Sequence, residues 1–187
     1  MNRSLAQLPV SRRWRQQAQP VATVGAIIRR DVNDEPCCLL IRRIHEPYVG
    51  QWALVGGRWE FGETLAEAVT REVQEETGLT TTFVALRSVV NELLAPGDPS
   101  AFGAHFVIFV CEVEALSGEP SEQAEGQVAW FTVSQLSDLH RHQAIVSTDY
   151  RILEQSFTLS RSLSYVETEV RLQGSSESST VRFENVG

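Results

Sequence analysis

Hydrophobic and polar positions repeat with two different periods along the chain, and each change of period marks an element. Apolar runs rich in β-branched residues predict strands at 21–30, 37–43, 80–95 and 104–116. The polar turn at 33–36 predicts a hairpin between the first two. Helical spacing predicts one helix beginning near Leu65, another over 145–157, and a turn or short helix from Val133. This order of elements predicts an α/β fold.

The helix near Leu65 carries its own start and stop signals. Thr64 and Glu67 have the spacing of a capping box, in which each side chain binds a free backbone N–H at the helix start. Gly78 suits the left-handed conformation that ends many helices. We therefore expect a helix of about three turns between these two points.

This predicted helix has an apolar stripe and an acidic flank. Its glutamates at 72, 75 and 76 fall within an arc of about 100° beside the stripe. Like charges at this spacing repel, so a cation is expected against them unless they form an ordinary solvated face. Oxygen-only ligands favour a hard cation, Mg²⁺ first and Mn²⁺ second. Arg71, one turn before Glu75, is placed to orient it.

Composition changes divide the chain into three parts. Residues 1–20 hold arginines and no acidic residue, which indicates a basic N-terminal extension that is partly disordered. Residues 21–157 contain the predicted strands and helices and form one domain. Residues 158–187 contain two alternating segments around a Gly-Ser-rich break, a pattern compatible with a β-hairpin extension.

Charge and cysteine content narrow the class of protein. A formal net charge of -8 argues against general nucleic-acid binding, because such a surface repels phosphate chains. No apolar run approaches the length that crosses a bilayer. Cys37, Cys38 and Cys111 match neither a disulfide framework nor a zinc site, and they fit apolar strands in a reducing compartment. We expect a cytoplasmic protein without a membrane or nucleic-acid partner.

The segment 57–79 also follows a fixed spacing, G-x5-E-x7-R-E-U-x-E-E-x-G-U, where U is a bulky apolar residue. Every specified position is met by Gly57, Glu63, Arg71, Glu72, Val73, Glu75, Glu76, Gly78 and Leu79. This motif resembles the signature of the Nudix hydrolases, which cleave nucleoside diphosphates linked to another moiety. The resemblance implies the Nudix fold, a mixed central β-sheet sandwiched between α-helices, and a Mg²⁺-dependent enzyme.

The resemblance also implies a set of metal ligands. In the family, the carbonyl before the first glycine of the motif joins carboxylates around the metal. Here that set is Gly56, Glu72, Glu75 and Glu76. Val55 stands where the family usually has proline, which we expect to make the approach to the glycines less rigid.

Further roles follow by resemblance or by charge. The general base is Glu72 or an acidic residue of the loop before Trp130, with Glu125 the first choice and Glu122 the second; solvated loop acids are the alternative. Arg71 orients the glutamates, and Glu63 supports the start of the helix. Two consecutive arginines, Arg42 and Arg43, are candidates to bind a substrate phosphate. His105 begins a strand, and we interpret it as structural.

The substrate is set outside the motif. The layout of segments around it looks most like bacterial ADP-ribose or nucleoside-diphosphate-sugar pyrophosphatases. The rival within the family is a nucleoside triphosphate pyrophosphatase acting on non-standard or oxidised nucleotides. The rival from another class is a nucleotide sensor without hydrolysis, against which the complete glutamate set argues. The expected partner is a small-molecule nucleotide, and a homodimer is compatible with the family.

Overall fold

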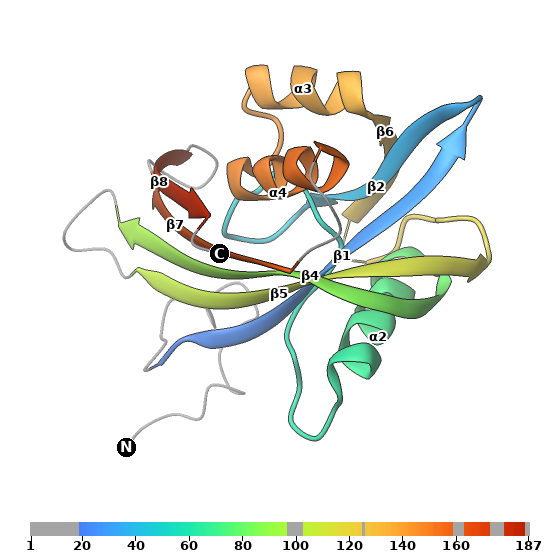
Figure 1. Ribbon diagram of the computed structural model, residues 1–187, viewed down its shortest axis with the longest axis horizontal. Helices are drawn as coiled ribbons and strands as arrows, with labels where there is room; N and C mark the ends of the chain where they lie inside the picture. The colour runs from blue at the N-terminus through green and yellow to red at the C-terminus, as the bar shows by residue number, and fades with distance from the viewer. Residues whose placement is uncertain (1–18, 97–102, 125, 159–162, 173–177, 186–187) are drawn as a thin grey trace.

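The chain folds into a curled mixed β-sheet with helices on both faces, seen in a computed structural model that describes residues 19–96, 103–124, 126–158, 163–172 and 178–185 (Figure 1). The strands are β1 (Val21–Val32), β2 (Glu35–Arg43), β3 (Trp52–Ala53), β4 (Thr80–Pro96), β5 (Ala104–Ser117), β6 (Gly126–Thr132), β7 (Ser164–Leu172) and β8 (Ser178–Asn185). The helices are α2 (Leu65–Thr77), α3 (Val133–Arg141) and α4 (Ser147–Thr158). Helix α2 covers one face, and α3 and α4 lie on the other.

Strand β1 joins the two halves of the sheet because it changes partner along its length. Its first part, Val21–Ile28, pairs in parallel with β5, whereas Arg29–Val32 pairs antiparallel with β2. The strand order is β3-β2-β1-β5-β4-β7-β8, and β6 pairs with β2 outside this path. A long strand shared in this way lets the sheet curl around the space between β2 and β5.

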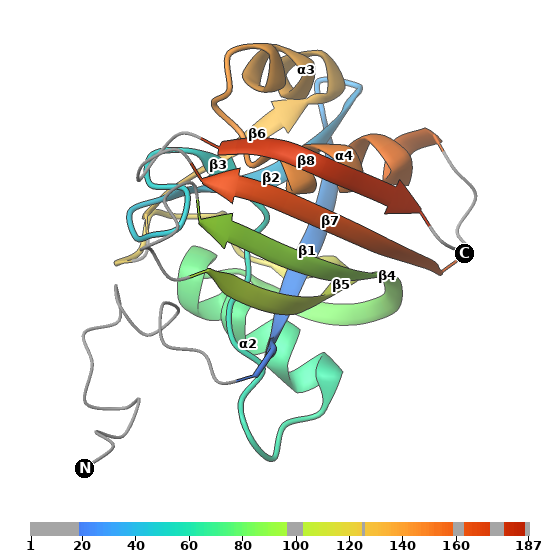
Figure 2. The ribbon, with the colours of Figure 1, turned by 90° about the vertical axis from the view of Figure 1, so that its left-hand side faces the viewer.

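The turn between β1 and β2 lies where the sequence predicts it. Asn33 and Asp34 have φ values of 53° and 63°, a left-handed conformation that these two residue types tolerate better than most. The C-terminal segments 164–172 and 178–185 also form an antiparallel pair. Figure 2 shows this pair beside β4, with which β7 pairs in parallel, so the two strands extend the main sheet.

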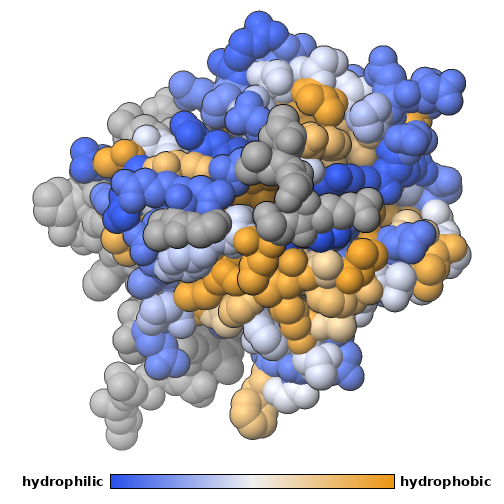
Figure 3. Space-filling model, viewed as in Figure 1, coloured by the Kyte–Doolittle hydropathy of each residue, from blue (hydrophilic) through white to orange (hydrophobic). Residues whose placement is uncertain are grey.

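The helix ends follow the capping rules. Thr64 and Glu67 form the predicted capping box of α2, and Gly78 ends the helix with φ 75°. Helix α3 begins at Val133, in agreement with the expected turn or short helix, and runs to Arg141; Thr132 and Gln135 form a second capping box at its start. Only Leu136 of α3 is buried, in agreement with the hydrophilic surface over this helix in Figure 3.

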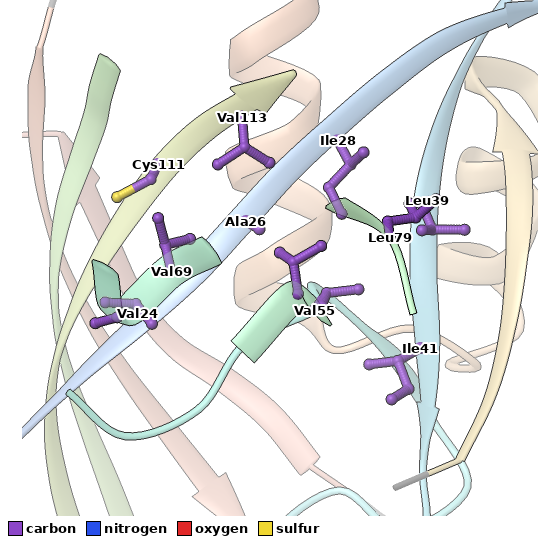
Figure 4. Close-up of a cluster of buried hydrophobic side chains, with 12 residues drawn as sticks. Val24, Ala26, Ile28, Leu39, Ile41, Val55, Val69, Leu79, Cys111 and Val113 are labelled. Carbon is purple, nitrogen blue, oxygen red and sulfur yellow. The ribbon is translucent and has the colours of Figure 1, made fainter. Parts of the chain in front are cut away.

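Apolar side chains fill both sides of the sheet. One cluster lies between the sheet and α2, and it contains Val69 together with side chains of β1, β2 and β5 (Figure 4). A second lies under α3 and α4 and includes Leu136 and Leu153. Burial raises the pKa of the Cys38 and Cys111 thiols to about 12, and all three cysteines are free and buried. None of the described helices is long and apolar enough to span a bilayer.

Candidate active site

A cleft of about 770 Å³ opens between β1, β2, β5 and the C-terminal half of α2. Besides Glu46 and Glu60, two groups of carboxylates line it. The first, which we call the motif carboxylates, consists of Glu72, Glu75 and Glu76 on α2. The second, which we call the inner carboxylates, consists of Glu92 on β4 and Asp149 on α4. The sheet therefore brings together acids that lie far apart in the sequence.

One short backbone segment connects the two groups. The N–H of Gly56 donates to Glu76 Oε2 at 2.8 Å, and the N–H of Leu54 donates to Asp149 Oδ2, also at 2.8 Å. Residues two apart in an extended chain are about 7 Å apart. One backbone segment therefore contacts an acid of each group, Asp149 through Leu54 and Glu76 through Gly56.

This segment is held rigidly against β1. The Val55 carbonyl accepts from the Ala26 N–H at 2.8 Å, and the Gly57 carbonyl accepts from the Val24 N–H at 2.9 Å. Gly56 has φ 153°, and a Cβ at this position would collide with the Val24 carbonyl oxygen. A glycine is therefore required here on two grounds, backbone conformation and space.

Gly57 makes room for a motif carboxylate. A Cβ built on Gly57 would lie 2.5 Å from Glu72 Oε2, so the absence of a side chain lets the carboxylate approach the backbone. The Glu72 side chain is only 12% exposed. The glycine pair thus fixes the positions of Glu72 and Glu76 from the side opposite the helix.

Arg71 binds the acids of the motif together. Its Nε donates to Glu63 Oε1 at 2.6 Å, and its Nη1 donates to Glu72 Oε1 at 2.8 Å and to Glu75 Oε2 at 3.1 Å. Its Nη2 donates to the Arg58 carbonyl at 3.0 Å. The hydrogen bonds from Arg71 hold the pKa of Glu63 below its usual value, and those that Arg71 makes to Glu63 and Glu72 raise its own pKa.

The donor chemistry of the motif carboxylates suits a hard divalent cation, because every side-chain donor is an oxygen. Among the residues that the structure describes, no three His, Cys, Asp or Glu side chains converge on one point as metal ligands. Glu72 and Glu75 bind Arg71 instead, and Glu76 binds the Gly56 N–H. Cation binding would require these carboxylates to turn toward one another within the same cleft.

The inner carboxylates have a different environment. Glu92 is 4% exposed and accepts from Thr148 Oγ1 at 2.8 Å. Burial, with a smaller contribution from the charge of Asp149, raises the pKa of Glu92 to about 7. Asp149 keeps some contact with solvent through the cleft, but desolvation by the surrounding protein raises its pKa to about 6.

The other residues predicted from the sequence fall in several places. Arg43 lines the cleft, and its Nε donates to the Pro47 carbonyl at 2.8 Å. Arg42 is exposed and does not line the cleft, because successive side chains of β2 point to opposite faces. Glu122 is also exposed and outside the cleft lining, and Glu125 lies outside the described residues. His105 lies 2.5 Å from Asn91 Oδ1, across β4 and β5.

Neither inner carboxylate was predicted from the sequence, although the position of each residue in its strand or helix could have drawn attention to it. Alternate residues of a strand face the same side, so Glu92 points inward with Val90 and Leu94, which are buried. It is therefore a charged residue at a core position. Asp149 lies in the first turn of α4, where an acid is common for local reasons. Only the folded chain shows that the two side chains face one cleft.

A family comparison agrees with this arrangement, because the NUDIX domain model matches residues 19–155. The chain belongs to the Nudix family. As a Nudix hydrolase it resembles the ADP-ribose pyrophosphatase of Methanocaldococcus jannaschii, with 31% identity over 74% of this chain and 78% of that protein. It also resembles the putative 8-oxo-dGTP diphosphatase 2 of Mycobacterium tuberculosis, with 31% identity over 64% of this chain and 77% of that protein.

Solved structures agree on the fold of this Nudix hydrolase. The MutT protein from Bacillus halodurans superposes with a TM-score of 0.65, covering 88% of this chain and 97% of that chain at 21% identity. The predicted α/β Nudix fold is confirmed, and so is the prediction of an enzyme. Nudix hydrolases generally use divalent metal cations, and the motif carboxylates occupy the helix expected to bind them.

Proposed function

We propose that this Nudix hydrolase cleaves the pyrophosphate bond of a nucleoside diphosphate linked to another moiety, with ADP-ribose or a related nucleotide sugar as its substrate. The observation that carries the proposal is that Gly56, Glu72, Glu75 and Glu76 all line one cleft. The similarity to an ADP-ribose pyrophosphatase supports the choice of substrate. A small-molecule nucleotide fits a cleft of about 770 Å³.

The motif carboxylates and the Gly56 carbonyl are the residues that would hold the metal, Mg²⁺ first and Mn²⁺ second. When bound, such an ion would offset the negative charge of the phosphates and lower the pKa of a water molecule. The Gly56 N–H already faces Glu76 at 2.8 Å, which supports a role for this stretch of backbone beside the carboxylates. Arg71 positions Glu72 and Glu75 through its shared Nη1 donor.

Glu72 is our choice for the residue that removes a proton from the attacking water. Its carboxylate is held between Gly57 and Arg71, close to the backbone that lines the cleft. Glu125 remains the alternative base in this proposal. Arg43 lines the same cleft and is our candidate for binding a phosphate group of the substrate, in preference to Arg42.

A second candidate substrate class is a nucleoside triphosphate that carries a non-standard or oxidised base. The 31% identity to a putative 8-oxo-dGTP diphosphatase supports this alternative. The two candidates differ in their products, because cleavage of ADP-ribose yields AMP and ribose 5-phosphate, whereas cleavage of a triphosphate yields a nucleoside monophosphate and pyrophosphate. We further propose that the reaction takes place in the cytoplasm, and that the enzyme forms a homodimer.

The test is a substrate panel with identification of the products. Purified protein is incubated with ADP-ribose, NADH, a UDP-sugar, dGTP and 8-oxo-dGTP, in Mg²⁺, in Mn²⁺ and with EDTA. We expect AMP and ribose 5-phosphate from ADP-ribose, and no product with EDTA. Pyrophosphate release from a triphosphate at a higher kcat/KM would favour the second candidate. If no compound is hydrolysed under any condition, the proposed function is wrong.

A further inference from the structure

Two walls of the cleft come from segments that lie far apart in the sequence, and one buried acid contacts both. The first wall is the loop between β2 and β3, in which residues 44–48 line the cleft. The second is the approach to α4 and its first turn, with Val146 and Asp149. Neither wall is a strand that pairs with β4. Glu92 on β4 is 4% exposed, and its side chain connects the two walls.

The Glu92 carboxyl group interacts with one hydroxyl group from each wall. Thr148, in the first turn of α4, donates from Oγ1 to Glu92 Oε1 at 2.8 Å. The Tyr48 hydroxyl faces the same carboxyl group, and each shifts the pKa of the other in the direction of a hydrogen bond in which Tyr48 donates. We call these three side chains the Glu92 junction. It joins the loop, β4 and α4 at one point.

The backbone at Tyr48 adds an independent observation. Its φ is 69°, in the left-handed region that a bulky residue adopts only when the surrounding structure holds it there. The side chain is 5% exposed and belongs to a small apolar cluster with Leu94 on β4 and Val146 beside α4. Tyr48 is therefore kept in a strained conformation by burial and by its contact with Glu92, so the shape of the loop depends on the Glu92 junction.

The surroundings of Glu92 favour its protonated form. The neighbouring strands place two uncharged residues, Phe106 and Thr168, beside it. Burial, and then the negative charge of Asp149, raises its pKa to about 7, against the opposing effects of its hydrogen bonds and of Arg43. The other titratable residues that line this part of the cleft are those of the loop, His45, Glu46 and Tyr48. Opening the Glu92 junction to water would return the pKa of Glu92 toward 4.5 and release its proton.

We propose that Glu92 is a positioning residue: through Tyr48 and Thr148 it holds the loop against the start of α4, and loss of its proton loosens this side of the cleft. Because loosening is coupled to release of the proton, the Glu92 junction is firmest below pH 4.5 and weakens as pH rises through about 7. The inference rests on the proposed function only where it assigns a consequence for substrate binding.

The first test needs no substrate, because it follows the opening of the walls themselves. Three backbone N–H groups report on them: Gly50 and Gln51 donate to the carbonyls of Arg43 and Tyr48, and Tyr150 donates to that of Val146. Their hydrogen exchange is measured by NMR in the wild type and corrected for the intrinsic effect of pH on exchange. We expect protection to fall about tenfold or more between about pH 5.5 and about pH 7.5, as the shift in the pKa of Glu92 implies.

The amide of Val73, buried inside α2, is the internal reference for global unfolding. Gly50 and Gln51 should exchange faster than Val73, because a local opening costs less free energy than unfolding of the whole domain. Loop amides that exchange only as fast as Val73, or whose protection does not change with pH, would overturn the proposal.

Three variants separate the Glu92 junction from general stability. Glu92→Gln keeps an acceptor for Thr148 but does not titrate, so the pH dependence of exchange should disappear. Tyr48→Phe keeps the buried ring and should speed exchange at the loop amides about threefold to tenfold, the scale of one hydrogen bond. Tyr150→Phe is the matched control, because its hydroxyl also donates to a glutamate, Glu154, but at an exposed site outside the cleft. It should leave loop exchange unchanged.

A Glu92→Gln variant that keeps the pH dependence of the wild type contradicts the inference. If Glu92→Gln does not fold, the pH dependence in the wild type and the difference between Tyr48→Phe and Tyr150→Phe decide the matter. Equal loop exchange in these two tyrosine variants would then count against the Glu92 junction.

Kinetics with the substrate test the consequence for the cleft. Tyr48→Phe should raise KM about threefold or more and leave kcat within about twofold, because the Glu92 junction shapes a wall and the motif carboxylates are unchanged. A lower kcat with unchanged KM would contradict this role. A protein that hydrolyses no compound of the panel disproves the proposed function, whereas the exchange experiment still tests the Glu92 junction. An enzyme that hydrolyses ADP-ribose with loop exchange independent of pH disproves only the positioning role of Glu92.

Discussion

The two groups of carboxylates in the cleft consist of the same chemical groups in opposite environments. On α2, Arg71 donates to Glu63, Glu72 and Glu75, and a cation in direct contact favours the charged form, as the lowered pKa of Glu63 shows. On β4 and α4, Glu92 and Asp149 have only neutral hydrogen-bond donors, and desolvation favours the neutral form.

This difference indicates which charge each group is prepared to receive. Carboxylates grouped on one helix flank around a guanidinium suit a metal ion and the phosphates it accompanies. Carboxyl groups that keep a proton suit neutral hydrogen-bonding groups, which an ionised pair would bind less selectively. One cleft therefore holds carboxylates paired with a guanidinium and carboxyl groups in which desolvation favours the neutral form.

The largest expected effect comes from removing a charge from the motif carboxylates. Glu76→Gln keeps the shape of the side chain and its contact with the Gly56 N–H, but removes one negative charge. We expect kcat to fall about 100-fold or more, the scale of losing a metal or base contribution. Steady-state kinetics with Mg²⁺ measures this. A fully active Glu76→Gln enzyme would show that Glu76 lies outside the chemistry, and Glu114→Gln serves as the charge-matched control.

A smaller effect is expected when the same group is displaced without changing its charge. In Gly57→Ala the new Cβ would lie 2.5 Å from Glu72 Oε2, so Glu72 must move from its place beside Arg71. We expect kcat to fall about tenfold to 100-fold, because misplacement of a reacting group by about 1 Å has this scale.

The melting temperature is the control for Gly57→Ala. Gly57 does not have a positive φ, so the substitution does not strain the backbone, and the melting temperature should change by only a few degrees. Unchanged kinetics in a well-folded Gly57→Ala variant would mean that the position of Glu72 beside Gly57 is not needed for turnover.

The smallest effect concerns stability, and its dependence on pH has opposite signs for Glu92 and for Glu63, the acid that Arg71 binds beside the motif carboxylates. The pKa of Glu92 is raised from 4.5 to about 7, so the folded protein binds more protons than the unfolded chain in this window, and stability falls as pH rises through it. Glu92→Gln should therefore show a decline in melting temperature between pH 5 and 8 that is smaller than that of the wild type by about 3 °C or more.

Glu63 provides the comparison with opposite sign. Its pKa is lowered, so its stabilising contribution is present above the unfolded pKa and is lost as pH falls. Glu63→Gln should lower the melting temperature at pH 7, and this difference from the wild type should shrink as the pH falls below 4.5, as thermal unfolding across pH would show. If the effects of Glu63→Gln and Glu92→Gln on melting temperature changed with pH in the same direction, the two acids would not differ in environment as we describe.

Local sequence patterns were sufficient to predict the helix that carries the motif and the turn between the first two strands. The capping box at Thr64 and the terminal Gly78 lie within one helix, and their hydrogen bonds involve residues a few positions apart. The β1–β2 turn is likewise decided by Asn33 and Asp34 themselves. Helix α3 begins at Val133 as expected, and its capping box, Thr132 with Gln135, is equally local.

The sequence by itself determined the Nudix family, the α2 helix and the glutamates on its flank, because these depend on spacing within one continuous segment. Only the tertiary structure decided that Arg43 lines the cleft and Arg42 does not, and that Glu92 and Asp149 face the same space. The physical reason is that burial and electrostatic environment depend on contacts between distant strands. Leu54 binds Asp149 and Gly56 binds Glu76 because the curl of the sheet places β4, α4 and α2 around one short backbone segment.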